Sequence, residues 1–301
     1  MKLSHKPVML SEIIKYLQPQ KGNVIVDCTV GTGGHSYELA KLILPEGRLI
    51  GIDRDKEALN LADEKLRGFG NYNLVHQNFK NIDAILRELN IEKVDGLLLD
   101  LGLSSFQLDN PQRGFSFKAS GYLDMRMDGE SSITAFDLIN NLAGEELEKI
   151  FREYSQERYA RRISESIIKA RQEGAITTTI QLADIIKKAI PSRRGFQGRS
   201  RRGSIHPATR VFQALRIVVN QELENLLVVL NKAIDFLKLG ARICVLSFHS
   251  GEDRLVKNEF KKFSRLGILN ILTKKPITPL EKEISINPRV RSAKLRVGER
   301  I

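Results

Sequence analysis

A glycine-rich segment near the N-terminus has the residue types of a site for a nucleotide-like ligand. Asp27 ends a short apolar run, and it is followed by Gly31, Gly33 and Gly34, with His35 at the start of a helical pattern. Glycine has no Cβ atom, so backbone N–H groups at the start of a helix can approach a ligand closely. The segment therefore predicts a ligand site that the glycines shape and to which Asp27 and His35 add polar groups.

A carboxylate on the next apolar run narrows the ligand to two cofactor classes. Asp53 ends that run, 22 residues after Gly31, where it could accept hydrogen bonds from both hydroxyls of a ribose. A dinucleotide site uses three glycines at fixed spacing, and Ser36 takes the third position here. S-adenosylmethionine carries no phosphate, and polar groups such as Asp27 and His35 suit its amino-acid end. The loop therefore favours S-adenosylmethionine over a nicotinamide cofactor, and Asp53 argues against a turn without any ligand.

The fourth apolar run brings the candidate groups for the reaction itself. It ends at Asp100, and Ser104 follows in the next loop. Methyl transfer needs a nucleophile held about 3–3.5 Å from the methyl group, and such positioning can lower the barrier by roughly 7–11 kcal/mol. Asp100 is best placed to accept an N–H from an exocyclic base amine, and Ser104 and His249 are weaker catalytic candidates. Asp100 could instead cap a loop or contact the cofactor. Phe79, after the third run, could lie against an adenine ring or serve as a core anchor.

Short apolar runs alternate with helical patterns along the first hundred residues. The first, second and fourth of these runs span 24–26, 49–52 and 97–99, and each ends directly before an aspartate. Continuous apolar runs fit strands that are covered on both faces, and their alternation with helices predicts a right-handed, doubly wound parallel sheet. Ligands bind beyond the carboxyl ends of such strands, which is where Asp53 and Asp100 are expected.

The alternation stops after the fourth run, and about a hundred residues of helical periodicity follow. We expect an inserted all-helical domain at 109–203, between the fourth and fifth strands of an α/β domain made of 1–108 and 204–301. Its position after the fourth strand predicts a role in presenting the substrate.

The C-terminal third resumes the α/β pattern. One long helix is expected over 212–237, with Gly240 just beyond its end. A strand follows at 243–248, and the last two strand candidates, 268–273 and 293–297, could form a terminal antiparallel pair.

The charge balance favours a polyanionic partner. Lys and Arg number 48 against 36 acidic residues, giving a net charge of +12 and a pI near 9.7. A phosphate backbone is the commonest partner of such a surface. A basic loop rich in glycine and serine, with a second arginine group near the C-terminus, predicts RNA contact, the alternative being a solvated linker. The RNA-binding candidates are Arg193, Arg194, Arg199, Arg201, Arg202, Arg289, Arg291 and Arg296, and Phe115, Phe117 and Tyr122 could stack on a base or belong to the core.

Several other classes find no support in the sequence. The N-terminal residues lack the apolar core of a signal peptide, and no run of about 18 apolar residues predicts a membrane span. Cys28 and Cys244 each lie in an apolar run, which predicts buried free thiols and a cytoplasmic location. The histidines show no metal-ligand spacing, so no metal is expected.

Short motifs spread over nearly the whole chain form a specific set. The first motifs are His5-x-Pro7-Val8-Met9, Asp27-Cys28-Thr29-Val30-Gly31-x-Gly33-Gly34-His35, Asp53-Arg54-Asp55 and Asp100-Leu101-Gly102-x-Ser104-Ser105-x-Gln107-Leu108. The others are Arg113-Gly114-Phe115-Ser116-Phe117, Leu123-Asp124-Met125-Arg126-Met127-Asp128, His206-Pro207-Ala208-Thr209-Arg210, Ser247-Phe248-His249-Ser250, Glu252-Asp253-Arg254 and Asn287-Pro288-Arg289-x-Arg291-Ser292. Together these motifs resemble the RsmH (MraW) family of small-subunit ribosomal RNA cytosine-N4 methyltransferases. One departure is Gly251, where the family usually has leucine.

The resemblance implies a class I, Rossmann-like S-adenosylmethionine methyltransferase domain with an inserted helical domain. It implies action on the N4 amine of one cytidine in the decoding region of 16S ribosomal RNA, in naked RNA or in the small subunit. Two other hypotheses stay open at this point: a nicotinamide-dependent oxidoreductase and a non-catalytic RNA-binding protein of ribosome assembly. The oligomeric state is open, with a homodimer as one option. The cofactor site implied by the resemblance comprises Gly33, Gly34, His35, Asp53, Phe79, Asp100 and Gln107.

Overall fold

The chain builds its first structural unit from two separate segments, Met1–Ser104 and Leu223–Ile301, and its second from the segment between them, Ser105–Glu222. The computed structural model describes residues 7–191 and 206–301. The second unit contains the whole of the expected insertion, 109–203, and is longer than it at both ends. Most of the added length is a helix, α10 (Ala208–Asn220), which the sequence had assigned to the α/β domain.

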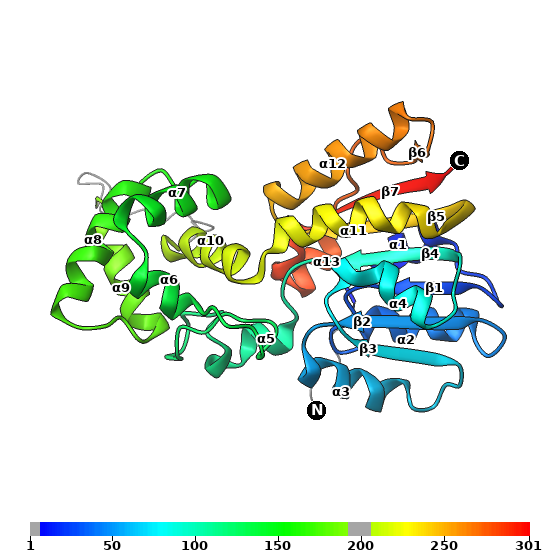
Figure 1. The fold of residues 1–301 in the computed structure, drawn as a ribbon, viewed down its shortest axis with the longest axis horizontal. Coiled ribbons are helices and arrows are strands. Elements are labelled where there is room, and N and C mark those ends of the chain that lie inside the picture. Colours follow the sequence, from blue (N-terminus) through cyan, green and yellow to red (C-terminus); the bar gives the residue numbers. More distant parts are fainter. Residues whose placement is uncertain (1–6, 192–205) are drawn as a thin grey trace. The chain divides into compact units, whose positions relative to one another are not determined.

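A parallel sheet forms the centre of the first unit. Its strands are β1 (Val24–Asp27), β2 (Arg48–Asp53), β3 (Tyr72–His76), β4 (Val94–Asp100) and β5 (Leu237–Ser247). They lie in the order β3-β2-β1-β4-β5, so the direction of winding reverses between β1 and β4 (Figure 1). In doubly wound sheets, ligands bind outside the carboxyl ends of the strands at this reversal. The predicted parallel sheet is therefore confirmed.

Two antiparallel strands complete the sheet beyond β5. β7 (Lys294–Arg300) pairs with β5, and β6 (Leu269–Ile271) pairs with β7. This confirms the predicted terminal pair. The side chains of β7 alternate between the two covered faces, so Leu295 and Val297 are buried.

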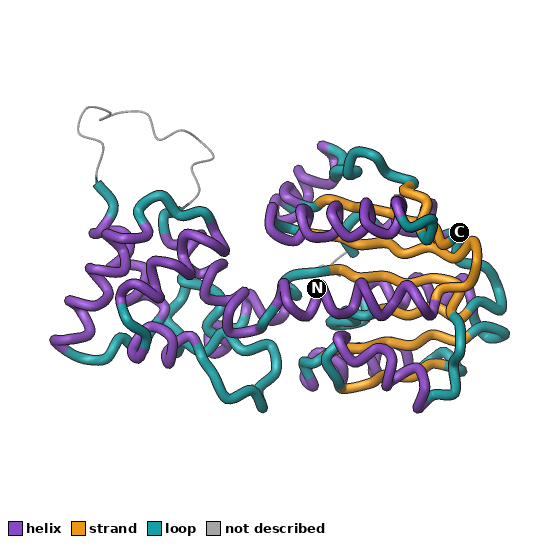
Figure 2. Tube along the Cα trace, turned by 45° about the horizontal axis from the view of Figure 1, so that its top comes forward, coloured by secondary structure: helices purple, strands orange, loops and turns teal. Residues whose placement is uncertain are grey.

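Helices cover both faces of this sheet (Figure 2). One face packs against α4 (Ile82–Glu88), α11 (Glu222–Phe236) and α12 (Ser250–Arg265), and the other against α1 (Leu10–Leu17) and α2 (Gly34–Ile43). Leu97 and Leu99 belong to the first layer and Leu98 to the second, which explains why the strand sequences are apolar at every position. The same unit includes α3 (Lys56–Leu66) and α13 (Glu281–Ile286).

The expected long helix at 212–237 is wrong. It is two helices, α10 and α11, separated by Gln221 in the left-handed conformation (φ 49°, ψ 42°). The N–H of Gln221 donates to the carbonyls of Ile217 and Val218, which closes the first helix. Gly240 is not the residue beyond the helix end, because it lies within β5.

The second unit is helical in its described part. It contains α5 (Ser105–Asp109), α6 (Ala135–Asn141), α7 (Gly144–Ser155), α8 (Ala160–Glu173), α9 (Thr179–Ala189) and α10. The helix α7 packs against both α8 and α10, and α8 packs against α9. Val211, Phe212 and Leu215 of α10 are buried, so this helix belongs to the core of the second unit. Among the described helices, none is both long and apolar enough to span a bilayer.

Candidate functional site

Three neighbouring strands of the first unit each end in an aspartate. Asp27 ends β1, Asp53 ends β2 and Asp100 ends β4. Since β1 lies between β2 and β4 in the sheet, the three carboxyl groups meet at one edge, on either side of the winding reversal. The sequence prediction that these residues share an edge is confirmed.

The glycine loop between β1 and α2 needs its glycines for two reasons. Gly31 and Gly33 have φ values of 52° and 75°, which side chains rarely tolerate. A Cβ at Gly33 would lie 3.2 Å from the Cα and Cβ of Ala62, and one at Gly34 would lie 3.3 Å from Pro7. Gly33 immediately precedes α2, so the loop presents the backbone N–H groups at the start of a helix, as predicted.

The carboxylate of Asp53 is held in place by backbone groups. Its Oδ2 accepts from the N–H of Gly31 at 2.7 Å, and its Oδ1 accepts from the N–H of Asp55 at 2.9 Å. Burial raises the pKa of Asp53 to about 6, and these two hydrogen bonds oppose that rise. Each carboxylate oxygen has a further lone pair, so the group can accept additional hydrogen bonds from a ligand.

The carboxyl group of Asp100 is half-buried, and one of its oxygens is buried without a hydrogen bond to the described residues. Its Oδ2 lies 3.4 Å from Nδ1 of His35, and its Oδ1 is buried without a hydrogen-bond partner in the described part of the chain. Burial raises the pKa of Asp100 to about 6; the nearby His35 lowers it, and the carboxylates of Asp27 and Glu252 raise it. An unpartnered buried acceptor is costly unless a ligand completes it.

Asp27 braces the loop from within. Its Oδ2 accepts from the hydroxyl of Ser36 at 2.6 Å, and its Oδ1 accepts from the N–H of Thr29 at 3.1 Å. Thr29 in turn accepts the N–H of Asp100 on its hydroxyl at 2.6 Å. Burial raises the pKa of Asp27. The direct cofactor contact predicted for Asp27 remains a prediction, since both of its oxygens already serve the loop.

The other predicted cofactor residues have mixed surroundings. Phe79 opens a short 3-10 helix after β3, is half-buried and packs against the main core, so both of its predicted roles stay open. Ser104 lies beside the glycine loop, because its Cβ is 3.8 Å from where a Cβ of Gly31 would be. Gln107 is buried in α5 of the second unit.

His249 has a structural role that the sequence analysis missed. It is the N-cap of α12, and its Nδ1 accepts from the N–H groups of Gly251 and Glu252. Glu252 accepts the N–H of Phe248 at 2.8 Å and lies 3.3 Å from Nε2 of His249. The spacing of His249 and Glu252, three residues apart before an amphipathic helix, was the available signal of this capping box.

The arginines predicted to bind RNA fall into three groups. Arg193, Arg194, Arg199, Arg201 and Arg202 lie outside the described residues. Arg289 and Arg291 are exposed in a 3-10 helix, Pro288–Ser292, as an RNA-binding rim requires. The prediction for Arg296 is wrong: it is 6% exposed, and its Nε donates to Asp253 at 2.7 Å. Lys294 contacts the same carboxylate at 3.1 Å, so Asp253 of α12 forms ion pairs with two residues of β7.

The three aromatic residues predicted to stack on bases also differ from one another. Phe115 is buried. Phe117 contacts the rings of His206 and Phe212, with centroids 4.6 and 4.9 Å away. Tyr122 is 46% exposed and stacks on Phe136. Only Tyr122 among these three combines an exposed ring with a stacked support.

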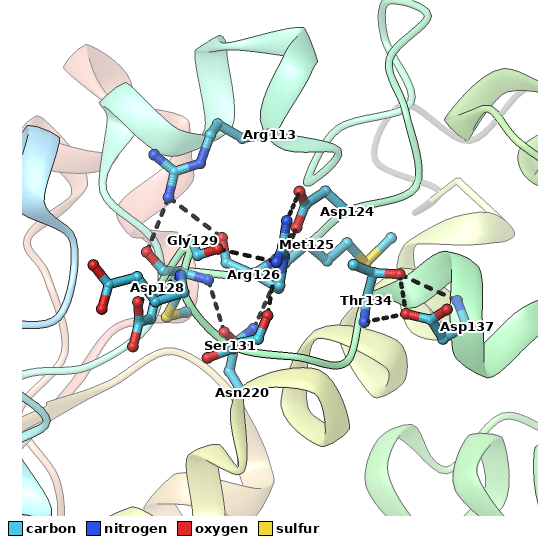
Figure 3. Close-up of polar contacts among 12 residues, drawn as sticks. Arg113, Asp124, Met125, Arg126, Asp128, Gly129, Ser131, Thr134, Asp137 and Asn220 are labelled. Atoms are coloured by element: carbon cyan, nitrogen blue, oxygen red, sulfur yellow. Dashed lines mark hydrogen bonds and ion pairs between the residues drawn. The ribbon is translucent and has the colours of Figure 1, made fainter.

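A polar network in the second unit holds the loop after Leu123 in one conformation (Figure 3). Arg126 makes a two-pronged contact with Asp124, at 2.7 and 2.9 Å, and also donates to backbone carbonyls further along the loop. Arg113 donates to the carbonyl of Met127 at 3.0 Å. The side-chain oxygen of Asn220 accepts a hydrogen bond from the N–H of Met127 at 2.8 Å. The sequence analysis found Arg113, Asp124, Arg126 and Met127 only within motifs, without a role, and did not single out Asn220.

Comparison with known proteins shows which family the chain matches. A family model described as the MraW methylase family matches residues 2–301. Ribosomal RNA small subunit methyltransferase H of Persephonella marina is 50% identical over 300 residues, covering 99% of this chain and 100% of that protein. The protein of the same name from Halothermothrix orenii is 48% identical over 314 residues, covering 99% of each. A solved rRNA methylase from Streptococcus thermophilus is 12% identical, with a TM-score of 0.42, covering 97% of this chain and 93% of that one.

The residues at the strand ends fit a cofactor that carries a ribose and a positive charge. Asp53 offers a fixed carboxylate, Asp100 Oδ1 is an acceptor without a partner among the described residues, and Gly33 lets a ligand approach the start of α2. S-adenosylmethionine is the cofactor, and the alternative of a nicotinamide-dependent oxidoreductase falls away, because a methylase model matches nearly every residue. This chain belongs to the MraW methylase family.

Proposed function

We propose that this protein transfers a methyl group from S-adenosylmethionine to small-subunit ribosomal RNA, at the N4 amine of a cytidine in the decoding region of 16S RNA. The names of relatives that are similar over their whole length support the class of substrate. The motif resemblance supports the atom and its position. The single observation that carries the catalytic part is the buried Oδ1 of Asp100 at the end of β4, which has no hydrogen-bond partner among residues 7–191 and 206–301.

The proposed cofactor site uses the edge where β1, β2 and β4 end. Backbone N–H groups at the start of α2 would meet the amino-acid end of the cofactor, and Asp53 would accept hydrogen bonds from its ribose. Asp100 has one oxygen beside His35 and the other available for a ligand. The full set proposed to hold S-adenosylmethionine is Gly31, Gly33, Gly34, His35, Asp53, Phe79, Asp100 and Gln107, with Asp27 bracing the loop.

The cofactor supplies an electrophilic methyl group, so the protein's main task is to orient the amine. The lone pair of an exocyclic amine is delocalised into its ring, and a carboxylate that accepts one N–H fixes the direction of the nitrogen. Asp100 is the residue proposed for this task. Ser104, beside the glycine loop, is a weaker candidate, and His249 ranks below it because its Nδ1 caps α12.

RNA binding is proposed to rest on positive charge at several places. Arg289 and Arg291 are exposed, and the net charge of +12 favours a phosphate backbone. The arginines at 193–202, which lie outside the described residues, are also proposed to bind RNA. The proposed substrate context is the small ribosomal subunit, and the hypothesis of a non-catalytic RNA-binding protein predicts that no methylation will be found.

Mass spectrometry of 16S RNA from cells with and without this protein tests the substrate directly. We expect N4-methylated cytidine to disappear from one decoding-region fragment in the cells that lack the protein. It should return with the parent protein and fail to return with Asp100→Ala. An unchanged RNA would contradict the proposed substrate.

Kinetics with purified components then separate the two roles of Asp100. At saturating cofactor, Asp100→Ala should be slower by about a hundredfold or more if the carboxylate orients the amine. Full recovery at saturating cofactor would assign Asp100 to cofactor binding alone. Glu64→Ala, an exposed substitution on α3, is the matched control and should behave as the parent.

A further inference from the structure

The chain's N-terminal segment lies directly on the cofactor loop. Pro7 contacts Gly34 closely enough that a Cβ there would be 3.3 Å away. The carbonyl oxygen of Val8 accepts a hydrogen bond from Nε2 of His35 at 2.9 Å, and both Val8 and His35 are buried. This backbone carbonyl is therefore a fixed partner of a side chain in the proposed cofactor site.

The hydrogen bond that His35 donates to the Val8 carbonyl determines how the His35 ring faces Asp100. A carbonyl can only accept, so Nε2 of His35 is the nitrogen that carries the hydrogen toward it. The other ring nitrogen, Nδ1, then faces Oδ2 of Asp100 at 3.4 Å. Asp27 and Glu252 are the other carboxylates that act on Asp100. A shift of Val8 would free the ring and change what Asp100 faces.

Met9 holds Val8 in place through an unusual conformation. Met9 has φ 51° and ψ 37°, in the left-handed region, and its side chain is fully buried. A non-glycine residue in this region costs free energy and needs support from its surroundings. The N–H of Met9 donates to Oε1 of Glu283 at 2.7 Å, and Glu283 belongs to α13, 274 residues further along the chain.

We propose that Glu283 is a positioning residue for the S-adenosylmethionine site, acting through Met9, Val8 and His35. Its carboxylate supports the left-handed turn at Met9, which places the Val8 carbonyl against His35 and so fixes the ring beside Asp100. The inference rests on the proposed function to the extent that His35 and Asp100 belong to the cofactor site. Glu283 itself does not touch the cofactor in this account.

Calorimetric titration of the full-length protein with S-adenosylmethionine tests the proposal. Glu283→Ala should weaken binding by about tenfold, because a charge-assisted hydrogen bond is lost. Glu283→Gln should stay within about twofold of the parent, since its amide oxygen can still accept from Met9. Glu281→Ala, an exposed carboxylate on the same helix, is the matched control and should bind as the parent does.

Nitrogen NMR of the histidine rings gives a readout that does not depend on activity. In the cofactor-free parent and in Glu283→Gln, the His35 spectrum should show a hydrogen fixed on Nε2 and a distinct signal for each ring nitrogen. In Glu283→Ala the two ring nitrogens should average. If Glu283→Ala does not fold, Glu283→Asp keeps the charge but withdraws the oxygen by one methylene, and it should show the same averaging. An unaltered His35 spectrum in Glu283→Ala, or in Glu283→Asp if the alanine variant does not fold, would overturn the proposal.

Two further variants separate a failure of this inference from a failure of the proposed site. His35→Ala should weaken cofactor binding if His35 belongs to the site, and adding Glu283→Ala to it should cause little further loss. Unchanged binding in His35→Ala would refute the site itself. Weakened binding in His35→Ala combined with unchanged binding in Glu283→Ala would refute only the role of Glu283.

Discussion

At the residue scale, the three aspartates at the strand ends have different surroundings. Both oxygens of Asp27 accept hydrogen bonds from the loop, both oxygens of Asp53 accept from backbone N–H groups, and Asp100 has an oxygen without a partner in the described chain. Burial raises the pKa of all three. The three aspartates therefore differ in role. Asp27 stabilises the loop, Asp53 is an acceptor fixed by backbone N–H groups, and Asp100 has an oxygen that a ligand could use.

Removing the Asp53 carboxylate should weaken S-adenosylmethionine binding by about 1.5–3 kcal/mol, because charge-assisted hydrogen bonds to the ribose would be lost. Calorimetric titration of Asp53→Ala measures this difference. Glu64→Ala removes the same charge from an exposed position on α3 and should leave the affinity unchanged. Equal affinities for Asp53→Ala and the parent would contradict the assignment of the ribose contact.

The raised pKa of Asp100 predicts a pH-dependent effect on stability in the cofactor-free protein. Its pKa is about 6 in the folded state against an ordinary value of 3.8. The group therefore stabilises the fold most below about pH 4, and this contribution disappears as the pH rises through 6. Asp100→Asn should unfold at a higher temperature than the parent at pH 8, with the advantage shrinking toward pH 4.5. Asp184→Asn, an exposed change, is the control, and a difference that does not depend on pH would count against burial of the charge.

At the element scale, the strands of the parallel sheet could be predicted because covering on both faces makes every position apolar. Leu97 and Leu98 face opposite helical layers, and both are fully buried. The break at Gln221 was missed because apolar residues keep helical spacing across it and only the backbone conformation changes. Arg296 was misassigned because its burial depends on Asp253, a partner 43 residues away that no local pattern reveals.

The candidate site shows the same division between local and long-range information. Gly33 and Asp53 could be predicted from local spacing, since a loop and a strand end define their positions. The local spacing of His249 and Glu252 also indicated that His249 caps α12. This was missed because His249 was considered only as a catalytic candidate. The contact between Met9 and Glu283 joins residues 274 positions apart, so no spacing rule could indicate it.

The loop network of the second unit gives a prediction about its stability. The side chain of Asn220 is buried, accepts the N–H of Met127 and donates to the carbonyl of Met125, each at 2.8 Å. Asn220→Ala should leave these groups unsatisfied and lower the free energy of unfolding by about 1–3 kcal/mol. Urea unfolding checks the value, and Asn60→Ala on the surface of α3 serves as the comparison. The prediction fails if the two variants are equally stable.

At the scale of the whole molecule, the boundaries of the second unit determine where the chain can be cut. Replacing 118–203 with a short linker would remove α7, the helix against which α10 packs, and would expose Val211 and Leu215. Replacing the entire unit, Ser105–Glu222, with a Gly/Ser linker leaves the sheet and its own core intact. Only the second design is expected to give a monodisperse protein.

The shortened protein should still bind S-adenosylmethionine, with an affinity reduced by the loss of Gln107, but should show no detectable methylation of small-subunit RNA. A target base must leave its stack at a cost of about a few kcal/mol, and the remaining unit offers few groups to offset it. Calorimetry tests the predicted cofactor binding, and methyl incorporation into RNA tests the predicted loss of methylation. Substantial methylation would show that the second unit does not present the substrate.

The contact between Met9 and Glu283 also has a consequence for the nascent chain during its synthesis. Met9 is synthesised before the glycine loop, and Glu283 follows Met9 by 274 residues. At synthesis rates of about 5–20 residues per second, the 274 residues between them take on the order of tens of seconds. During this time the turn at Met9 lacks its carboxylate partner. A chain that lacks Glu283 would therefore hold the methyl donor poorly, so chains synthesised past Glu283 would bind it in preference to shorter ones.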